Sequence, residues 1–269
     1  MIIKNFQNLI LLFRHCVLEL FKYKKFSSTK SYFLDKKGFY IFKINPNKID
    51  HIKELVEKEV NKFSTKKRGD KRFHGIELEN VEIREFMNGV LNQEIKFIKE
   101  VSTIKRLYVH NMMGGNLSEN NGESSGGGWH IDHYFEQFKL LIYLNDVDNE
   151  NGPFSYIERS HKKLVQFLCL LFFKLFSKNI TRFNFFTVKL IKLFFFKKQK
   201  IITGPKGTAV VFNSSGLHRG LSLVKDNRVS LTAYIFPHGD YDKNNEKRND
   251  KFNIPKNLRN KQINVHKIL

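Results

Sequence analysis

Two side chains that could hold a metal ion stand close together after a run of glycines. They are His130 and Asp132, in residues 126–135 (GGGWHIDHYF). Residues two apart in a β-strand point to the same face, so the imidazole and the carboxylate would lie side by side. Two histidines and one carboxylate form the facial donor set of non-heme Fe(II) oxygenases, which leaves other positions on the metal open. A chain of this composition contains a His-x-Asp pair about 0.4 times by chance, so the pair requires a third ligand as support.

The candidate third ligand is His218, and its context supports it. Arg228 follows ten residues later and Ser230 two residues after that, so the two share one face of an expected strand. A guanidinium beside a hydroxyl suits a carboxylate, because Arg donates a bidentate pair of hydrogen bonds and Ser one more. This spacing together with the His-x-Asp pair is expected about 0.01 times in a random chain. The combination favours a metal site with a carboxylate site beside it.

The composition is that of an ordinary globular protein apart from its charge and its phenylalanines. Lys and Arg number 47 against 26 Asp and Glu, and there are 27 Phe residues. The charge predicts attraction to anionic surfaces and ligands, although the codon usage of an AT-rich genome would also enrich Lys. The two cysteines, Cys16 and Cys169, lie in apolar runs, which favours a reducing compartment. Without a secretory cleavage pattern or an apolar run of about 18 residues, we expect a cytoplasmic protein with scope for peripheral membrane contact.

The N-terminal third should be mainly helical. Apolar residues at helical spacing predict an amphipathic helix within an N-terminal segment 1–33, packed on the protein or on a membrane surface. A short strand is expected at 39–42 and helices at 46–63 and 81–98, with a polar loop at 64–72 between them.

From residue 103 the periodicity changes to two. Strands are expected at 103–110, 140–144, 153–157, 208–212 and 228–236. Short strands separated by turns indicate an antiparallel sandwich or barrel. Residues 114–128 are rich in Gly, Ser and Asn and predict a loop that leads to His130, and residues 237–269 predict a polar tail.

Residues 162–200 interrupt the β pattern. They contain ten Lys or Arg residues and no acid, with apolar blocks at 164–176 and 183–196. Each block is too short to span a bilayer. Two interpretations stay open: a pair of helices over the mouth of the barrel, or a contact with a membrane surface through 164–196. The Phe residues form continuous apolar runs and not spaced stacking platforms, which argues against nucleic-acid binding.

At residues 34–236 the sequence resembles the phytanoyl-CoA dioxygenase family of Fe(II)- and 2-oxoglutarate-dependent oxygenases. The resemblance is carried by the following segments: Gly38-Phe-Tyr, His130-Ile-Asp-His-Tyr-Phe, Asn149-Glu-Asn-Gly-Pro-Phe-Ser-Tyr-Ile, Ser160-His-Lys, Lys206-Gly-Thr, His218-Arg-Gly and Arg228-Val-Ser. It departs from the family at Arg159, where the family usually has Gly, and in the basic insertion 162–200. It implies a mainly β fold with flanking helices around a double-stranded β-helix, the jelly-roll or cupin-like core.

The resemblance also implies roles for particular residues. His130, Asp132 and His218 fall on the metal ligands, and Arg228 with Ser230 on the 2-oxoglutarate carboxylate site, with Tyr143 towards the cosubstrate. His133 and His161 are expected to form hydrogen bonds and not to bind the metal, and Arg219 to contact a substrate anion or water. Asp132 makes hydroxylation the default outcome, because a Gly or Ala at this position would open a halide site.

The implied reaction consumes dioxygen and 2-oxoglutarate on Fe(II), hydroxylates a C–H bond of a small-molecule or lipid-like substrate, and releases succinate and CO₂. Two alternatives remain. One is a catalytically inactive jelly-roll protein that docks a membrane or a protein partner through its basic, Phe-rich insertion, and the other is a cupin-like metalloenzyme without 2-oxoglutarate. The sequence identifies neither the substrate nor the oligomeric state.

Overall fold

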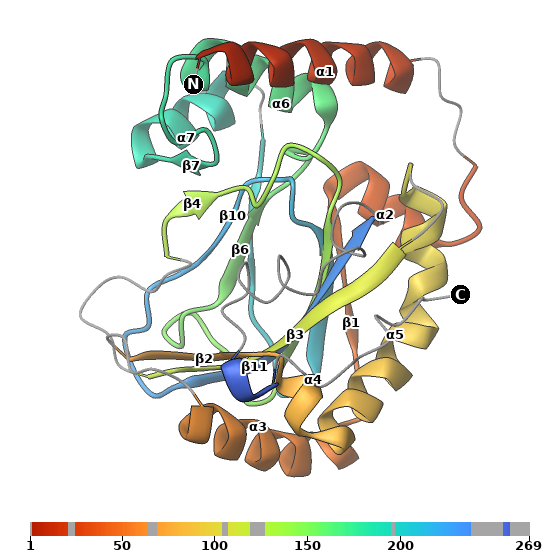
Figure 1. The fold of residues 1–269 in the computed structure, drawn as a ribbon, viewed down its shortest axis with the longest axis vertical. Coiled ribbons are helices and arrows are strands. Elements are labelled where there is room, and N and C mark those ends of the chain that lie inside the picture. The colour runs from red at the N-terminus through yellow and green to blue at the C-terminus, as the bar shows by residue number, and fades with distance from the viewer. Residues whose placement is uncertain are drawn as a thin grey trace.

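Two antiparallel sheets form the core of the protein, and helices cover their outer faces (Figure 1). The computed structural model describes residues 2–20, 25–63, 69–103, 107–118, 127–194, 197–237 and 255–258. The larger sheet has the strand order β1-β9-β5-β11-β3-β2 and the smaller one β7-β4-β10-β6-β8. The prediction of a mainly β jelly-roll core with flanking helices is confirmed.

The strands of the larger sheet are β1 (Phe39–Lys43), β9 (Thr208–Asn213), β5 (Phe138–Tyr143), β11 (Arg228–Pro237), β3 (Leu107–Leu117) and β2 (Asp70–His74). Those of the smaller sheet are β7 (Arg182–Phe183), β4 (Trp129–His130), β10 (His218–Gly220), β6 (Phe154–Ile157) and β8 (Gln199–Ile202). The helices are α1 (Ile2–Leu20), α2 (Thr29–Lys37), α3 (Ile49–Phe63), α4 (Ile76–Glu79), α5 (Val81–Val101), α6 (Lys163–Cys169) and α7 (Phe185–Phe194). Single helical turns lie at Pro46–Lys48, Leu170–Lys174 and Lys256–Leu258, and the second of these, a π-helical turn, continues α6.

Local sequence explains the main elements. Helix α3 buries Ile49, Ile52, Val56 and Val60, which recur at three and four residues and so form one apolar stripe. Helix α5 begins after Asn80, whose side chain accepts a hydrogen bond from the Ile83 amide at 3.1 Å. Strand β9 is buried at every position, as expected of a strand covered on both faces.

Helices close the two outer faces of the sandwich at opposite ends of the molecule (Figure 1). Helices α3 and α5 pack on the larger sheet, in a core that includes Leu140 and Ile235. Helices α1, α6 and α7 pack on the smaller sheet, around Trp129 and Ile131. None of the helices in the described parts of the chain is both long and apolar enough to cross a bilayer.

The insertion 162–200 contains the two expected helices, α6 and α7, joined through the short strand β7. This strand adds to the edge of the smaller sheet, where Phe183 pairs with Trp129 and Arg182 with His130. The insertion is therefore part of the same hydrogen-bonded sheet as the candidate metal ligand His130.

Three expectations need correction or lie beyond the description. The predicted loop 64–72 ends in β2, a polar edge strand that begins at Asp70; residues 64–68 lie outside the described residues. The predicted loop 114–128 is strand up to Leu117, and its residues 119–126 are likewise not described. The sequence analysis also did not predict helix α2. The predicted tail lies outside the description except for residues 237 and 255–258.

Gly114 shows why a glycine-rich stretch can be a strand. A Cβ at this position would lie 2.7 Å from Ile76 Cδ1 and 2.9 Å from Val60 Cγ2. Because glycine has no side chain, α3 and α4 can pack directly on the backbone of β3.

Candidate metal centre

The two candidate histidine ligands lie on neighbouring strands. His130 ends β4, His218 begins β10, and the two are direct cross-strand partners with ring centroids 4.3 Å apart. Asp132 follows β4, and its amide donates to the Ser214 carbonyl at 2.9 Å. Because side chains alternate along the strand, Trp129 turns towards the helices while His130 turns inward. The sheet pairing thus brings together residues 88 positions apart.

Both imidazoles are held so that the Nε2 atom faces Asp132. The Nε2 atoms of His130 and His218 each lie 3.9 Å from Asp132 Oδ1. On the other side of each ring, Nδ1 lies 2.8 Å from the Gly128 carbonyl in His130 and 2.9 Å from the Gly216 carbonyl in His218. A carbonyl oxygen only accepts, so each Nδ1 carries the hydrogen and each Nε2 presents a lone pair.

Burial keeps both imidazoles neutral near neutral pH. Desolvation lowers the pKa of His130 to about 4, against the opposing effects of the Gly128 carbonyl and Asp132. Desolvation and the neighbouring His130 lower the pKa of His218 well below its usual value. Neutral imidazole is the form that binds metal ions.

The three side chains form a site that fits a metal ion. One ligand atom from each of His130, Asp132 and His218 lies within 4.8 Å of the others. Two neutral nitrogen donors and one carboxylate oxygen on one side of the ion suit non-heme Fe(II) and leave the other side open.

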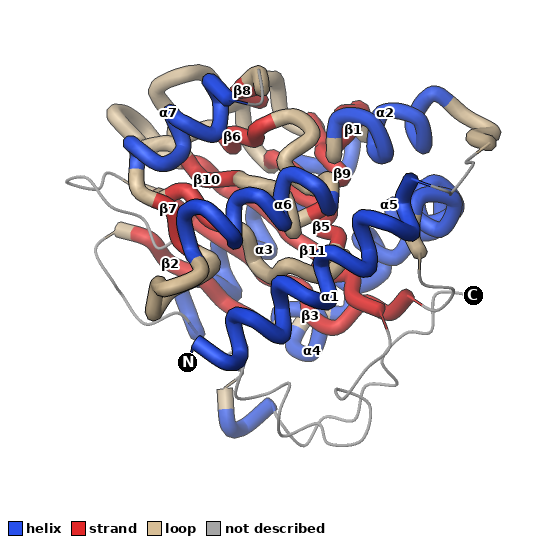
Figure 2. The backbone as a smooth tube through the Cα atoms, turned by 90° about the horizontal axis from the view of Figure 1, so that it is seen from above, coloured by secondary structure: helices blue, strands red, loops and turns tan. Residues whose placement is uncertain are grey.

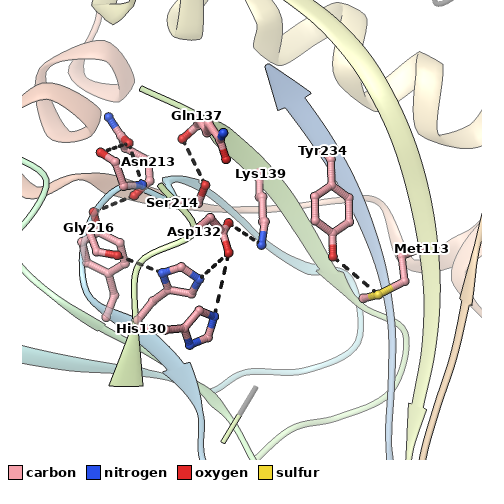
Figure 3. Close-up of polar contacts among 12 residues, drawn as sticks. Met113, His130, Asp132, Gln137, Lys139, Asn213, Ser214, Gly216 and Tyr234 are labelled. Carbon is pink, nitrogen blue, oxygen red and sulfur yellow. Dashed lines mark hydrogen bonds and ion pairs between the residues drawn. The ribbon is translucent and has the colours of Figure 1, made fainter. Parts of the chain in front are cut away.

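The structure adds Lys139, which sequence reasoning missed. Its Nζ lies 2.6 Å from Asp132 Oδ2, so that one carboxylate oxygen is held by the lysine and the other faces the histidines (Figure 3). Lys139 also lies over the Tyr234 ring, 4.6 Å from its centroid. The sequence did contain a sign of this contact. Lys139 shares a strand face with Leu141 in a largely buried strand, and a buried charge requires a partner.

The ion pair changes the acidity of both groups. Burial raises the pKa of the Asp132 carboxyl, but Lys139 and His218 outweigh burial and hold that pKa well below its usual range. Burial lowers the pKa of Lys139, and the attraction of Asp132 outweighs it, so the net pKa lies above the usual value. Both groups are therefore charged in the folded protein.

A cavity of about 110 Å³ lies between the sheets beside this site. Its lining includes the charged side chains of Asp70, Arg72, Lys139 and Arg228 and the neutral imidazoles of His130 and His218. Asp70 and Arg72 come from β2, the strand that the sequence had suggested was loop, and they pair with each other at 2.9 Å. Ser230 lines the cavity two residues after Arg228, as the strand alternation predicts.

Arg228 is half-buried at the start of β11, and the buried Nε of its guanidinium is unused. Its Nη1 donates to the Gly152 carbonyl, whereas its Nε has no hydrogen-bond partner among the described residues. A buried donor without a partner is costly, so the position favours an anion that would accept from it. The geometry fits the carboxylate site expected from Arg228 and Ser230.

The remaining candidates lie outside the metal cluster found among the described residues. Tyr143 lies opposite Ser230 on β5, and its hydroxyl donates to the Ile202 carbonyl at 2.9 Å and accepts from the Phe154 amide at 2.8 Å. His133 Nδ1 accepts from the Phe135 amide at 3.0 Å, and His161 Nε2 lies 2.9 Å from the Asp35 carbonyl. Arg219 stacks over Trp129 at 4.7 Å from the ring centroid.

Solved structures with a similar fold include an alpha-ketoglutarate-dependent enzyme and a protein crystallised with iron. The epimerase SnoN from nogalamycin biosynthesis, in complex with Fe³⁺, alpha-ketoglutarate and nogalamycin RO, matches with a TM-score of 0.58 and 12% identity, over 77% of this chain and 82% of that chain. EctD from S. alaskensis with bound Fe matches with a TM-score of 0.57 and 11% identity, over 78% and 76% of the two chains. The chain therefore shares its jelly-roll fold with these two structures, which hold iron, one of them together with alpha-ketoglutarate.

A third solved structure with a similar fold contains nickel and 2-oxoglutarate. HygX from Streptomyces hygroscopicus, with nickel and 2-oxoglutarate bound, matches with a TM-score of 0.53 and 14% identity, over 79% of this chain and 88% of that chain. No protein-family model matches the sequence, and neither does the sequence of any curated protein. The narrower resemblance to the phytanoyl-CoA dioxygenase family remains a prediction.

Proposed function

We propose that the protein is a non-heme Fe(II)- and 2-oxoglutarate-dependent dioxygenase that hydroxylates a C–H bond of a small-molecule or lipid-like substrate. The observation that carries the proposal is the convergence of His130, Asp132 and His218 beside a cavity that the two histidines line together with Arg228. In the overall reaction, R–H, O₂ and 2-oxoglutarate give R–OH, succinate and CO₂, which balances in atoms and charge. Fe(II), when bound, would supply the open positions for dioxygen and the 2-oxo acid.

The residues of the chain have distinct tasks in this proposal. His130 and His218 bind the metal through Nε2, and their Nδ1 hydrogen bonds fix the ring orientations. Asp132 binds through Oδ1 and contributes one negative charge, while Lys139 holds Oδ2. The side chain at residue 132 is a carboxylate, so that no position for a halide is opened, and hydroxylation is the expected outcome.

The cosubstrate would bind by its far carboxylate at Arg228 and Ser230. The unused Nε of Arg228 and the Ser230 hydroxyl both belong to the inner face of β11. Tyr143 would support this carboxylate site indirectly, because its hydroxyl joins β5 to the backbone of the smaller sheet close to Arg228. A guanidinium in this place selects a dicarboxylic 2-oxo acid over a monocarboxylic one.

The first experiment measures succinate formed from 2-oxoglutarate by the purified protein with Fe(II) under air, without an added substrate. We expect slow turnover in the wild type and none in His218→Ala, which also loses Co(II) binding. Arg228→Ala should retain Co(II) binding and raise the apparent KM for 2-oxoglutarate about 10- to 100-fold, since it removes charged hydrogen bonds to the carboxylate.

Two results would contradict the proposal. Absence of succinate together with Co(II) binding that His130→Ala leaves unchanged would favour the inactive jelly-roll binding protein. Turnover of an organic substrate that requires metal but neither 2-oxoglutarate nor Arg228 would favour a cupin-like metalloenzyme. A metabolite screen for 2-oxoglutarate-dependent mass gain would then identify the substrate.

A further inference from the structure

Exposed apolar side chains gather at one end of the molecule. Of the nineteen large hydrophobic side chains exposed in the described chain, fourteen belong to α1 or to residues 163–194. The most prominent, each at least 65% exposed, include Ile3, Ile10, Phe172, Phe176, Phe185 and Phe186. Helices α1, α6 and α7 form this end together (Figures 1 and 2). We call their outward face the α1–α6–α7 surface.

The surface is built from elements that are fixed to one another. Asn5 is buried, and its Nδ2 donates to the Leu175 carbonyl at 2.8 Å. The Phe13 and Phe167 rings lie 5.7 Å apart, joining α1 to α6. On α1, Leu9, Leu12 and Cys16 are buried, whereas a second apolar stripe at positions 3, 6, 10, 13 and 17 faces outward. The helix thus carries one apolar stripe for the protein and another that the described chain leaves exposed.

The charged side chains around these apolar groups are mainly basic. Lys178, Arg182, Lys189 and Lys198 are exposed in the insertion, which has no acidic residue between positions 162 and 200. On α1 the basic residues are Lys4 and Arg14, both exposed. The one acid of α1, Glu19, accepts a hydrogen bond from the Lys163 amide at 3.3 Å. The α1–α6–α7 surface is therefore apolar and cationic.

We propose that the α1–α6–α7 surface docks on an anionic lipid bilayer. Phenylalanine, leucine and isoleucine side chains would enter the boundary between headgroups and acyl chains, and the lysines would meet anionic headgroups. The composition favours lipid over a protein partner: protein interfaces enrich Tyr, Trp and Arg and deplete Lys, whereas residues 162–200 contain nine Lys, one Arg and no Tyr or Trp. The inference does not depend on the proposed oxygenase function.

The test is co-sedimentation of the full chain with vesicles. Wild-type protein should sediment with vesicles of phosphatidylserine and phosphatidylcholine, much less with phosphatidylcholine alone, and less as NaCl is raised, because salt screens the lysines. The double variant Phe172→Ser/Phe176→Ser should lower the partition coefficient about 100-fold, at roughly tenfold for each phenylalanine removed from the bilayer. Lys178→Glu/Lys189→Glu should abolish the preference for anionic vesicles.

The chain offers a matched control away from this surface. Val224 and Val81 are 69% and 51% exposed, so Val81→Ser/Val224→Ser removes exposed apolar groups without touching the three helices. This control should sediment like the wild type, and circular dichroism should show all variants folded. Ile3→Ser/Ile10→Ser should weaken binding as well if α1 belongs to the docking surface.

The proposal is overturned if wild-type protein fails to sediment with anionic vesicles, or if Phe172→Ser/Phe176→Ser sediments as well as the wild type and the valine control. It is also overturned if light scattering shows a dimer that Phe172→Ser/Phe176→Ser dissociates while vesicle binding is absent. The surface would then serve a second copy of the chain.

Discussion

Replacement of Lys139 by Met tests whether the buried ion pair with Asp132 holds the metal-free site together. Lys139 Nζ and Asp132 Oδ2 are 2.6 Å apart, and their side chains are 12% and 23% exposed. Breaking a buried pair costs about 3–5 kcal/mol, because the remaining charge has no partner. We expect a loss of unfolding free energy at the lower end of this range, about 3 kcal/mol, because Asp132 keeps some contact with solvent. For a chain of this size that corresponds to a fall in Tm of about 6–10 °C.

The control is an ion pair of the same length on the surface. Lys206 Nζ and Asp50 Oδ2 are also 2.6 Å apart, but their side chains are 38% and 67% exposed. Lys206→Met should therefore cost at most about 1 kcal/mol, because water and salt already screen this pair. The comparison separates burial of the ion pair from the loss of a lysine as such.

Calorimetry is the assay, with EDTA and then with Co(II). In EDTA, Lys139→Met should melt well below the wild type and Lys206→Met close to it. With saturating Co(II) the deficit of Lys139→Met should shrink, because the metal supplies a cation to Asp132 and binding to the folded state adds stability. The reasoning is refuted if Lys139→Met and Lys206→Met melt together in EDTA, or if Co(II) leaves the deficit of Lys139→Met unchanged.

Two further predictions concern pH and packing. Metal-free protein should lose stability as the pH falls from about 6.5 towards 4: burial lowers the pKa of folded His130 to about 4, so the unfolded chain takes up the proton first. Between pH 7 and pH 5 the loss from His130 alone is about 2 kcal/mol, and equal urea midpoints at the two pH values in EDTA would contradict it. Gly114→Ala should cost about 1–3 kcal/mol through the contacts of its Cβ with Ile76 and Val60. Gly89→Ala, with no neighbour within 4 Å in α5, should be neutral or stabilising, so equal losses at both positions would exclude a packing cause.

The sequence predicted the parts of the site that depend on local spacing. The two-residue spacings pointed to His130 with Asp132 and to Arg228 with Ser230, although β4 ends at His130 and Asp132 lies just beyond it. The spacing of Arg228 and Ser230 after His218 pointed to the third candidate, and the resemblance supported it. Spacing could not predict the contact between Lys139 and Asp132, which depends on the packing of the two sheets. Lys139 follows Asp132 by seven residues, yet its role depends on how β5 faces the end of β4.

Strand β2 was wrongly predicted as loop for the same reason, because local spacing does not show where a segment lies in the sheet. Four of the residues 70–74 are polar because the strand lies at the edge of the larger sheet, so apart from Phe73 its composition is that of a loop. Arg72 and the cavity wall that it forms were missed as a result. Gly114 of β3 led to the same error, because it permits close helix packing and does not mark a turn.

The pairing of β7 with β4 would couple membrane docking to metal binding through thermodynamic linkage. Arg182 belongs to the insertion that carries the α1–α6–α7 surface, and it shares a backbone ladder with His130. If contact with a bilayer stabilised the position of β7 that best supports His130, lipid would raise metal affinity by some factor. Reciprocity then requires metal to raise lipid affinity by the same factor. An iron-loaded and an iron-free molecule would distribute differently between membrane and solution.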